Sequence, residues 1–185
     1  PNLGKAKQNG LPRRVADDRV HRFSGEYGKT PLLFTERVVA REPKAWVVDL
    51  TLDDGASSRS LRVRLDVYGR PLTASRLDGE REVLVPIDEY YAFVEPTVFA
   101  ADRNEGFLGV ERATCLVGAA ELECETKSYR VRVGEQSGKL AVTGSAALPG
   151  RDVAGEITTA DGRVLYRAEL LEHANQPASR SLAGR

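Results

Sequence analysis

Apolar and polar residues alternate along much of this chain, and this alternation constrains its fold more than any other feature. The segment AWVVDLTLD (residues 45–53) has an apolar residue at every second position, and SLRVRLDVY (residues 60–68) repeats the pattern. Successive side chains of a β-strand point to opposite faces, so a period of two is typical of strands with one buried and one solvated face. The sequence therefore predicts that these segments pair across the loop between them, apolar face beside apolar face.

The rest of the chain shows the same kind of pattern with turn residues between the segments. Further strands are predicted at about 32–41, 71–77, 80–85, 105–117, 121–133 and 138–147. A hairpin is predicted in VAGEITTADGRVLYRAEL (residues 153–170), because Asp-Gly favours a two-residue type I′ turn. In that register Ile157 opposes Tyr166 and Gly155 opposes Ala168.

A single helix is predicted, in PIDEYYAFVEP (residues 86–96). Proline suits the first turn of a helix, and a second proline can stop it. Apolar and aromatic residues recur there at helical spacing, so a short helix packed on a sheet is expected. Strands and helices do not alternate along the chain, which favours an antiparallel sheet. The predicted fold class is therefore all-β to α+β.

The two ends of the chain differ in composition from its middle. Residues 1–30 are polar, are interrupted by glycine and proline, and keep no period of 2 or 3.6. They are predicted to form an extended N-terminal arm that orders only against a partner. Residues 174–185 are predicted to form a loose C-terminal tail. A single antiparallel β domain is expected between them, over residues 31–173.

The chain contains two cysteines, Cys115 and Cys124, in TCLVGAAELEC. If a hairpin loop is centred between Ala119 and Ala120, the cysteines face each other at a site where the Cα atoms lie about 4.5 Å apart, which permits a disulfide. Two buried free thiols are the alternative. Metal or redox chemistry is less favoured, because the two histidines lie near the chain ends and the spacing is not Cys-x-x-Cys. A disulfide would place the protein outside the cytoplasm.

The sequence around these cysteines resembles a known group of proteins. GVERATCLVGAAELECETKSYRV (residues 109–131), followed by LPG at 148–150, the Asp-Gly turn and a closing strand, is similar to exported bacterial β-clam or half-barrel proteins related to periplasmic lipoprotein carriers. The residues that carry the resemblance are Gly118, Leu122, Cys124 and the LPG segment, and it covers about residues 105–173. It implies a periplasmic location and a strongly curved antiparallel sheet with helical cover on its concave side. The carriers hold acyl chains between sheet and helix.

Two sets of residues are candidates for binding. The first is an apolar stripe on one face of the predicted sheet, and it either lines a pocket for an acyl chain or forms ordinary core. It consists of Trp46, Val48, Leu50, Leu61, Val63 and Leu65. The second is aromatic and lies on the predicted helix, where it either forms an interface or simply covers the sheet. It consists of Tyr90, Tyr91 and Phe93.

Composition narrows the classes of function. The 27 basic and 27 acidic side chains cancel, so the overall charge suggests no polyanion partner and no nucleic acid. We find no nucleophile motif and no ligand series for a metal or cofactor, which disfavours an enzyme. The predicted function is that of an exported accessory or binding subunit of a cell-envelope assembly, with protein partners contacted through the N-terminal arm. The alternative is a periplasmic carrier of a lipid or another apolar ligand. Association with a membrane is left open.

Overall fold

A computed structural model describes residues 13–26, 30–79, 81–98, 101–148 and 152–175. These residues form one sheet of eleven strands with a short α-helix and one turn of 3-10 helix. In chain order the elements are β1 (Asp17–Ser24), β2 (Leu32–Arg41), β3 (Trp46–Asp53), β4 (Ser58–Leu65), β5 (Pro71–Asp78), β6 (Arg81–Val85), α1 (Ile87–Val94), η1 (Glu95–Thr97), β7 (Arg103–Val117), β8 (Ala120–Val133), β9 (Gln136–Gly144), β10 (Asp152–Thr159) and β11 (Val164–Asn175).

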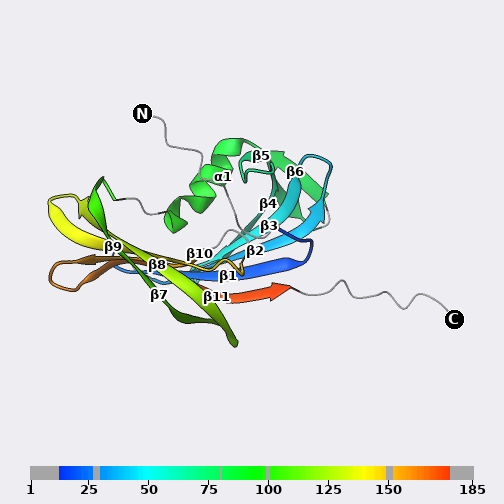
Figure 1. The fold of residues 1–185 in the computed structure, drawn as a ribbon. Helices are drawn as coiled ribbons and strands as arrows, with labels where there is room; N and C mark the ends of the chain where they lie inside the picture. Colours follow the sequence, from blue (N-terminus) through cyan, green and yellow to red (C-terminus); the bar gives the residue numbers. More distant parts are fainter. Residues whose placement is uncertain (1–12, 27–29, 80, 99–100, 149–151, 176–185) are drawn as a thin grey trace.

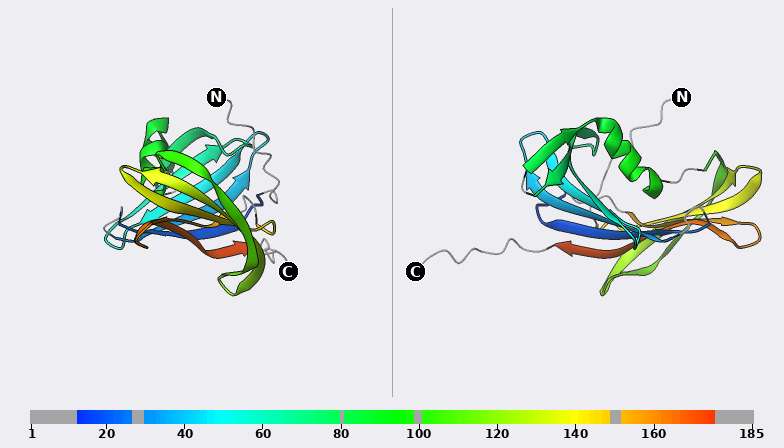
Figure 2. Two further views of the ribbon diagram at one scale, coloured as in Figure 1. Left: turned by 60° about the vertical axis from the view of Figure 1, so that its left-hand side comes forward. Right: turned by 180° about the vertical axis from the view of Figure 1, so that it is seen from behind.

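The sheet consists of two antiparallel meanders that meet at its centre. The strand order is β6-β5-β4-β3-β2-β1-β11-β10-β9-β8-β7, so the first and last strands of the chain are neighbours. The sheet is strongly curved and open, and α1 lies in its hollow (Figures 1 and 2). Since β6 and β7 form the two opposite edges, the segment with α1 and η1 crosses the concave face to connect them. The predicted half-barrel with a single short helix is confirmed.

One half of the concave face is filled by the core beneath α1. Side chains from β2, β3, β4 and β5 form a continuous buried cluster with Phe93 of the helix. The other members of the cluster are Val38, Val48, Leu50, Leu52, Leu61, Val63, Leu65 and Ala74. Val48 opposes Val63 and Leu50 opposes Leu61, as the alternation in β3 and β4 predicted.

The convex face is covered by cross-strand pairs of arginine with aspartate or glutamate. Asp49 lies directly opposite Arg62 in the register, and their side chains approach to 2.6 Å. Arg22 and Glu169 pair in the same way across β1 and β11, also at 2.6 Å. Opposite charges at directly facing positions stabilise a sheet modestly. Because each of these arginines has its own carboxylate, these parts of the face offer little free positive charge to a polyanion.

The prediction of an extended N-terminal arm is wrong for residues 17–24. Residues 17–24 form β1, which pairs with β2 on one side and with β11 on the other. Its inward positions carry Asp17, Arg19 and His21, so the apolar alternation that marks the other strands is missing. Residues 1–12 lie outside the described part of the chain. The predicted C-terminal tail begins at 174, but β11 continues to Asn175.

The Asp-Gly hairpin has the predicted register but a different turn. Ile157 pairs with Tyr166 as expected. The loop, however, comprises the three residues 160–162, since the Thr159 amide donates to the Arg163 carbonyl at 2.9 Å. A bulge in β11 then restores the register. Only the local turn was predicted incorrectly, and the pairing of the two strands was not affected.

The cysteines are joined by a disulfide, but not at the predicted register. The loop between β7 and β8 is Gly118-Ala119, and Gly118 takes a φ of 57°, a backbone conformation that glycine adopts without strain. The loop is therefore centred one residue earlier than predicted. Cys115 consequently opposes Leu122, two pairs along from Cys124, and the bond joins the strands diagonally with the Cα atoms 5.9 Å apart.

Candidate functional site

A transverse row of apolar side chains crosses the half of the sheet that α1 does not cover. Phe107 of β7 opposes Tyr129 of β8, and their ring centroids are 5.5 Å apart. Tyr129 opposes Leu140 of β9, which opposes Ile157 of β10. Ile157 in turn opposes Tyr166 of β11, whose hydroxyl donates to the Thr97 carbonyl just after α1. The row therefore lies on the concave face.

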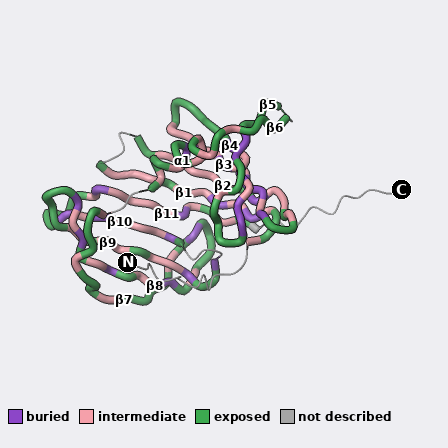
Figure 3. The backbone as a smooth tube through the Cα atoms, turned by 90° about the horizontal axis from the view of Figure 1, so that it is seen from above, coloured by how far each residue is buried: buried purple, intermediate pink, exposed green. Residues whose placement is uncertain are grey.

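Burial decreases along this row towards the edge of the sheet. Ile157 is 1% exposed, whereas Phe107 at the β7 edge is 60% exposed. In Figure 3, β7 is drawn almost entirely as exposed. Val110 and Val142 share the concave face with the row, because both oppose Lys127, and they are 46% and 38% exposed. Exposed apolar side chains gathered on one face of a soluble protein mark an interaction site.

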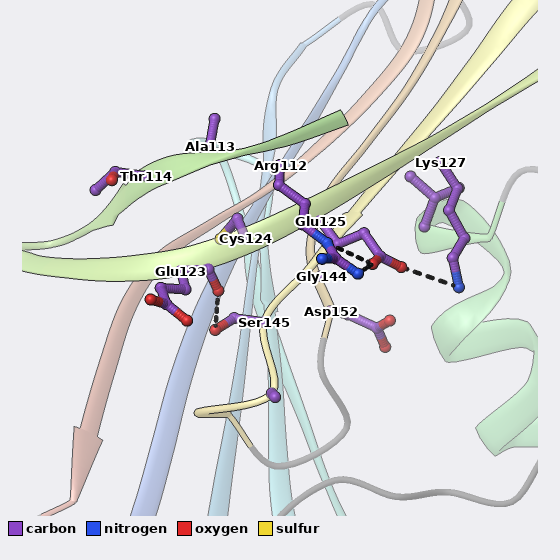
Figure 4. Close-up of a pocket in the computed structure, with 12 residues that line it drawn as sticks. Arg112, Ala113, Thr114, Glu123, Cys124, Glu125, Lys127, Gly144, Ser145 and Asp152 are labelled. Atoms are coloured by element: carbon purple, nitrogen blue, oxygen red, sulfur yellow. Dashed lines mark hydrogen bonds and ion pairs between the residues drawn. The ribbon is translucent and has the colours of Figure 1, made fainter. Parts of the chain in front are cut away.

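An open groove of about 730 Å³ lies beside these residues (Figure 4). It is lined by residues of β7, β8 and β9, of the turn after β9, and by the first residue of β10. They are Arg112, Ala113, Thr114, Glu123, Cys124, Glu125, Lys127, Val142, Gly144, Ser145, Ala146 and Asp152. The apolar row and the charged groove together form what we call the open face.

Glu125 is the central charge of the groove. Its carboxylate lies 3.4 Å from the Arg112 guanidinium and 3.4 Å from the Lys127 ammonium (Figure 4). Hydrogen bonds from Lys127 and then Arg112 lower the pKa of this carboxyl below its ordinary value. The groove therefore contains both positive and negative side chains, which largely neutralise one another. It is not a cleft lined by charges of one sign.

A cluster of ionisable groups adjoins the groove where β1, β2 and β11 meet. Arg19 and Asp17 are buried, at 9% and 2% exposure. Burial lowers the pKa of Arg19, and the charge of Glu36 opposes that shift. Burial raises the pKa of Asp152, which lines the groove, while the charge of Arg19 opposes it. β1 and β10 flank β11, and Arg19 and Asp152 lie towards the same end of that strand, so the cluster adjoins the groove.

The predicted ligand stripe lies in the filled half of the sheet. Of its six residues, all but Trp46 are at most 4% exposed, and they pack against Phe93 of α1. Trp46 is half-buried beside them and stacks under Arg41, whose guanidinium carbon is 4.9 Å from the ring centroid. The stripe packs as ordinary core, which was the alternative interpretation.

The three aromatic residues of α1 have different environments. Phe93 is 5% exposed and belongs to the core. Tyr90 is half-buried against the same cluster, and burial raises the pKa of its hydroxyl. Tyr91 is 54% exposed and meets the ring of Tyr90 at 5.4 Å. As a candidate interface the set is thus reduced to Tyr91.

The open face was not predicted from the sequence. Phe107, Tyr129 and Leu140 are far apart in the chain, and only the strand order places them in one row. The sequence did contain one signal for it, because the apolar residues of β7 are interspersed with glycine and charged residues.

No helix within the described residues is long and apolar enough to cross a membrane. Among the same residues, no group of three or more His, Cys, Asp or Glu side chains is placed to hold a metal ion.

Comparisons with known proteins find similarity in structure. In sequence, no protein-family model and no curated protein matches the chain. A candidate lipoprotein from Parabacteroides distasonis is 11% identical, with 89% of this chain and 97% of that chain covered and a TM-score of 0.45. A candidate exported protein with a YmcC-like fold from Bacteroides fragilis is 12% identical, with 90% and 99% covered and a TM-score of 0.40.

MucB is a third similar structure, 11% identical at a TM-score of 0.49, with 94% of this chain and 58% of MucB covered. This chain therefore spans little more than half the length of MucB. The resemblance predicted from residues 105–173 was also to exported proteins, and these structures include a candidate lipoprotein and a candidate exported protein. At TM-scores below 0.5, we take the function of this chain from its own residues.

Proposed function

We propose that this chain is a non-enzymatic, extracytoplasmic binding protein that holds a protein partner on its open face. The observation that carries the proposal is the row from Ile157 to Phe107, which becomes progressively exposed towards the β7 edge beside the groove. Partly exposed aromatic and aliphatic side chains flanked by charge are typical of the centre and rim of protein interfaces.

The disulfide supports a location outside the cytoplasm. Cys115 and Cys124 are bonded, and disulfides persist mainly in oxidising compartments. Cys124 also lines the groove and packs in a small apolar cluster with Val117 and Leu170. The bond therefore holds the part of the β7–β8 hairpin that forms one wall of the binding surface.

A protein partner fits the open face better than a lipid does. A carrier of acyl chains needs a continuous apolar cavity of several hundred cubic ångströms. The half of the concave face beneath α1 is filled by side chains, and the groove on the other half is lined by five charged residues: Arg112, Glu123, Glu125, Lys127 and Asp152. Carriage of lipid is therefore the weaker of the two proposals.

The location proposed for the partner differs from the sequence prediction. Residues 17–24 of the predicted arm already have partners within the sheet, in β2 and β11. These residues cannot also serve as a detached arm. We therefore place the partner contact on the open face.

The test compares two exposed apolar residues on opposite edges of the sheet. Phe107→Ser alters the open face, and Leu84→Ser alters β6, where Leu84 is 72% exposed. Native mass spectrometry of each variant, isolated from its own host with the disulfide intact, identifies what is bound. We expect a protein partner in the wild type and in Leu84→Ser, with at least about tenfold less in Phe107→Ser, as for an aromatic interface residue. A bound lipid without protein, or equal loss in both variants, would contradict the proposal.

A further inference from the structure

Among the described residues, Arg19 is the only buried arginine. Its side chain lies on the concave face at 9% exposure, and among the described residues it forms no hydrogen bond and no ion pair within 4.0 Å. Arg22, three residues along the same strand, lies on the convex face and donates to Glu169 at 2.6 Å. None of its nitrogen atoms is both fully buried and without a partner, so the unpaired N–H groups keep contact with solvent and can donate to a ligand.

Two of the three carboxylates whose charges act on Arg19 already have other contacts, and the third is Asp152 of the groove. Glu36 forms an ion pair with Arg13 at 3.0 Å. One oxygen of Asp17 accepts the backbone amide of Arg14 at 2.6 Å. The charges of both carboxylates reach Arg19, but burial outweighs them and lowers its pKa. The N–H groups of the Arg19 guanidinium therefore have no acceptor among the described residues.

A second unpartnered group lies directly beside Arg19. His173 of β11 is opposite Arg19 in the register, and its Nε2 atom is buried without a hydrogen-bond partner. The charge of Arg19 acts on His173 and contributes to lowering its pKa, after burial. Asp17 Oδ1 is another buried polar atom of β1 without a hydrogen-bond partner. Two donors and one acceptor thus lie together on the concave face. Asp152, which is next to Arg19, lines the groove.

We propose that Arg19 and His173 receive a carboxylate from the protein partner that occupies the open face. A guanidinium offers two parallel N–H groups to a carboxylate, and a neutral histidine can donate from Nε2. Of the acidic side chains near this point, Glu36 is paired with Arg13, and Asp17 lies two residues along the strand from Arg19. The inference rests on the proposed function, because it identifies one chemical group of that partner.

The experiment uses acetate as the probe, without the partner, so its result is independent of the Phe107→Ser test. Acetate, acetamide and chloride are titrated at matched ionic strength into the full chain while NMR follows the Nε–H signal of Arg19. We expect a saturating shift with acetate and none with the neutral acetamide. Equal shifts with all three would overturn the proposal.

Matched variants test whether Arg19 itself is responsible. In Arg19→Met the affinity for acetate, followed by the backbone amide shifts of β1, falls by about tenfold or more, as for a charge-assisted pair. Arg22→Met, on the opposite face of the same strand, leaves it unchanged. If Arg19→Met does not fold, Arg19→Lys keeps the charge, loses the planar fork and binds acetate more weakly. An acetate response that persists in both Arg19 variants would rule out the site, and so would its loss in Arg22→Met.

The unfolding temperature provides a second readout. An arginine that is buried without partners can be replaced by methionine with no loss of stability. We therefore expect Arg19→Met to melt at the same temperature as the wild type or higher. A large fall in the melting temperature would show that Arg19 is held by internal partners, which would overturn the proposal.

Discussion

The two halves of the concave face begin from the same alternating pattern and end differently. On the β2–β5 half, nine buried residues form one continuous cluster under α1. On the β7–β11 half, the concave-face cluster has four buried residues, and Phe107 and Val110 remain exposed. The difference shows that alternation specifies which face of a strand is apolar, whereas the covering element decides whether that face becomes core or a binding surface.

The half with the smaller clusters is also the half with the disulfide. Cys124 belongs to a second cluster, of five buried residues, and lies on the opposite face of β8 from Tyr129; Cys115 and Leu122 pack against this cluster. A small apolar cluster buries little surface, so a covalent link there supplies stability that packing does not. This division of roles predicts different responses to mutation on the two sides of β1.

The largest expected effect is a cavity in the covered half. Leu50 is 2% exposed in the centre of the cluster under α1. Leu50→Ala should lower the free energy of unfolding by about 3 kcal/mol, because the side chain is lost from a site that cannot collapse fully. Urea-induced unfolding followed by circular dichroism measures the change.

Phe107→Ala is the control on the open half. Its ring is 60% exposed, so the expected loss is about 0.5 kcal/mol, in the range of ordinary surface substitutions. Comparable losses in Leu50→Ala and Phe107→Ala would mean that the two halves do not differ in the way the burial indicates.

An intermediate effect is expected from removal of the disulfide. The bond closes a loop with a sequence separation of 9, and the chain-entropy model gives about 2–3 kcal/mol for a loop of this size. The Cys115→Ser and Cys124→Ser double variant should lose this amount. Hydrogen exchange should increase in residues 113–125 and leave β3 and β4 protected.

The exchange pattern separates a local role of the disulfide from a global one. If β3 and β4 exchange as fast as the β7–β8 hairpin in the double variant, the two halves unfold as one unit. The proposed independence of the open half would then be wrong, although the loss of stability itself would still be observed.

The sequence predicted the strands well where one face is apolar and failed where it is not. Residues 32–41 were predicted as a strand and form β2 with the same bounds. Strand β1 was missed, because Asp17, Arg19 and His21 occupy the inward positions that are apolar elsewhere. Its pairing with β11, more than a hundred residues away, depends on long-range contacts that no local pattern specifies.

The same limit applies to the candidate site. The sequence predicted the disulfide partners correctly, since two cysteines nine residues apart in a hairpin have few other options. It could not predict the open face, because Phe107, Tyr129 and Leu140 become neighbours only through the strand order. It also could not distinguish core from pocket in the apolar stripe, since the position of α1 decides between them.

The smallest expected effect is a dependence of stability on pH at β1, where the two halves meet. His21 stacks on Phe23 with ring centroids 6.2 Å apart. Burial and the charge of Arg19 lower its pKa, and Glu36 partly opposes them. The folded protein thus favours the neutral ring, while the unfolded chain protonates it near the ordinary pKa of about 6.5. Stability is therefore complete above about pH 6.5 and falls as the pH drops towards the lower folded-state pKa.

His21→Gln should remove part of this dependence, because glutamine has a polar side chain that does not titrate. The measurement is the urea midpoint at a series of pH values between 7.5 and 5, for wild type and variant. His173 has a pKa lowered in the same direction, so some slope should remain in His21→Gln and disappear in the double variant with His173→Gln. If the urea midpoint of the double variant depends on pH as strongly as that of the wild type, neither histidine contributes to this dependence. The carboxylates alone would then account for the loss of stability at low pH.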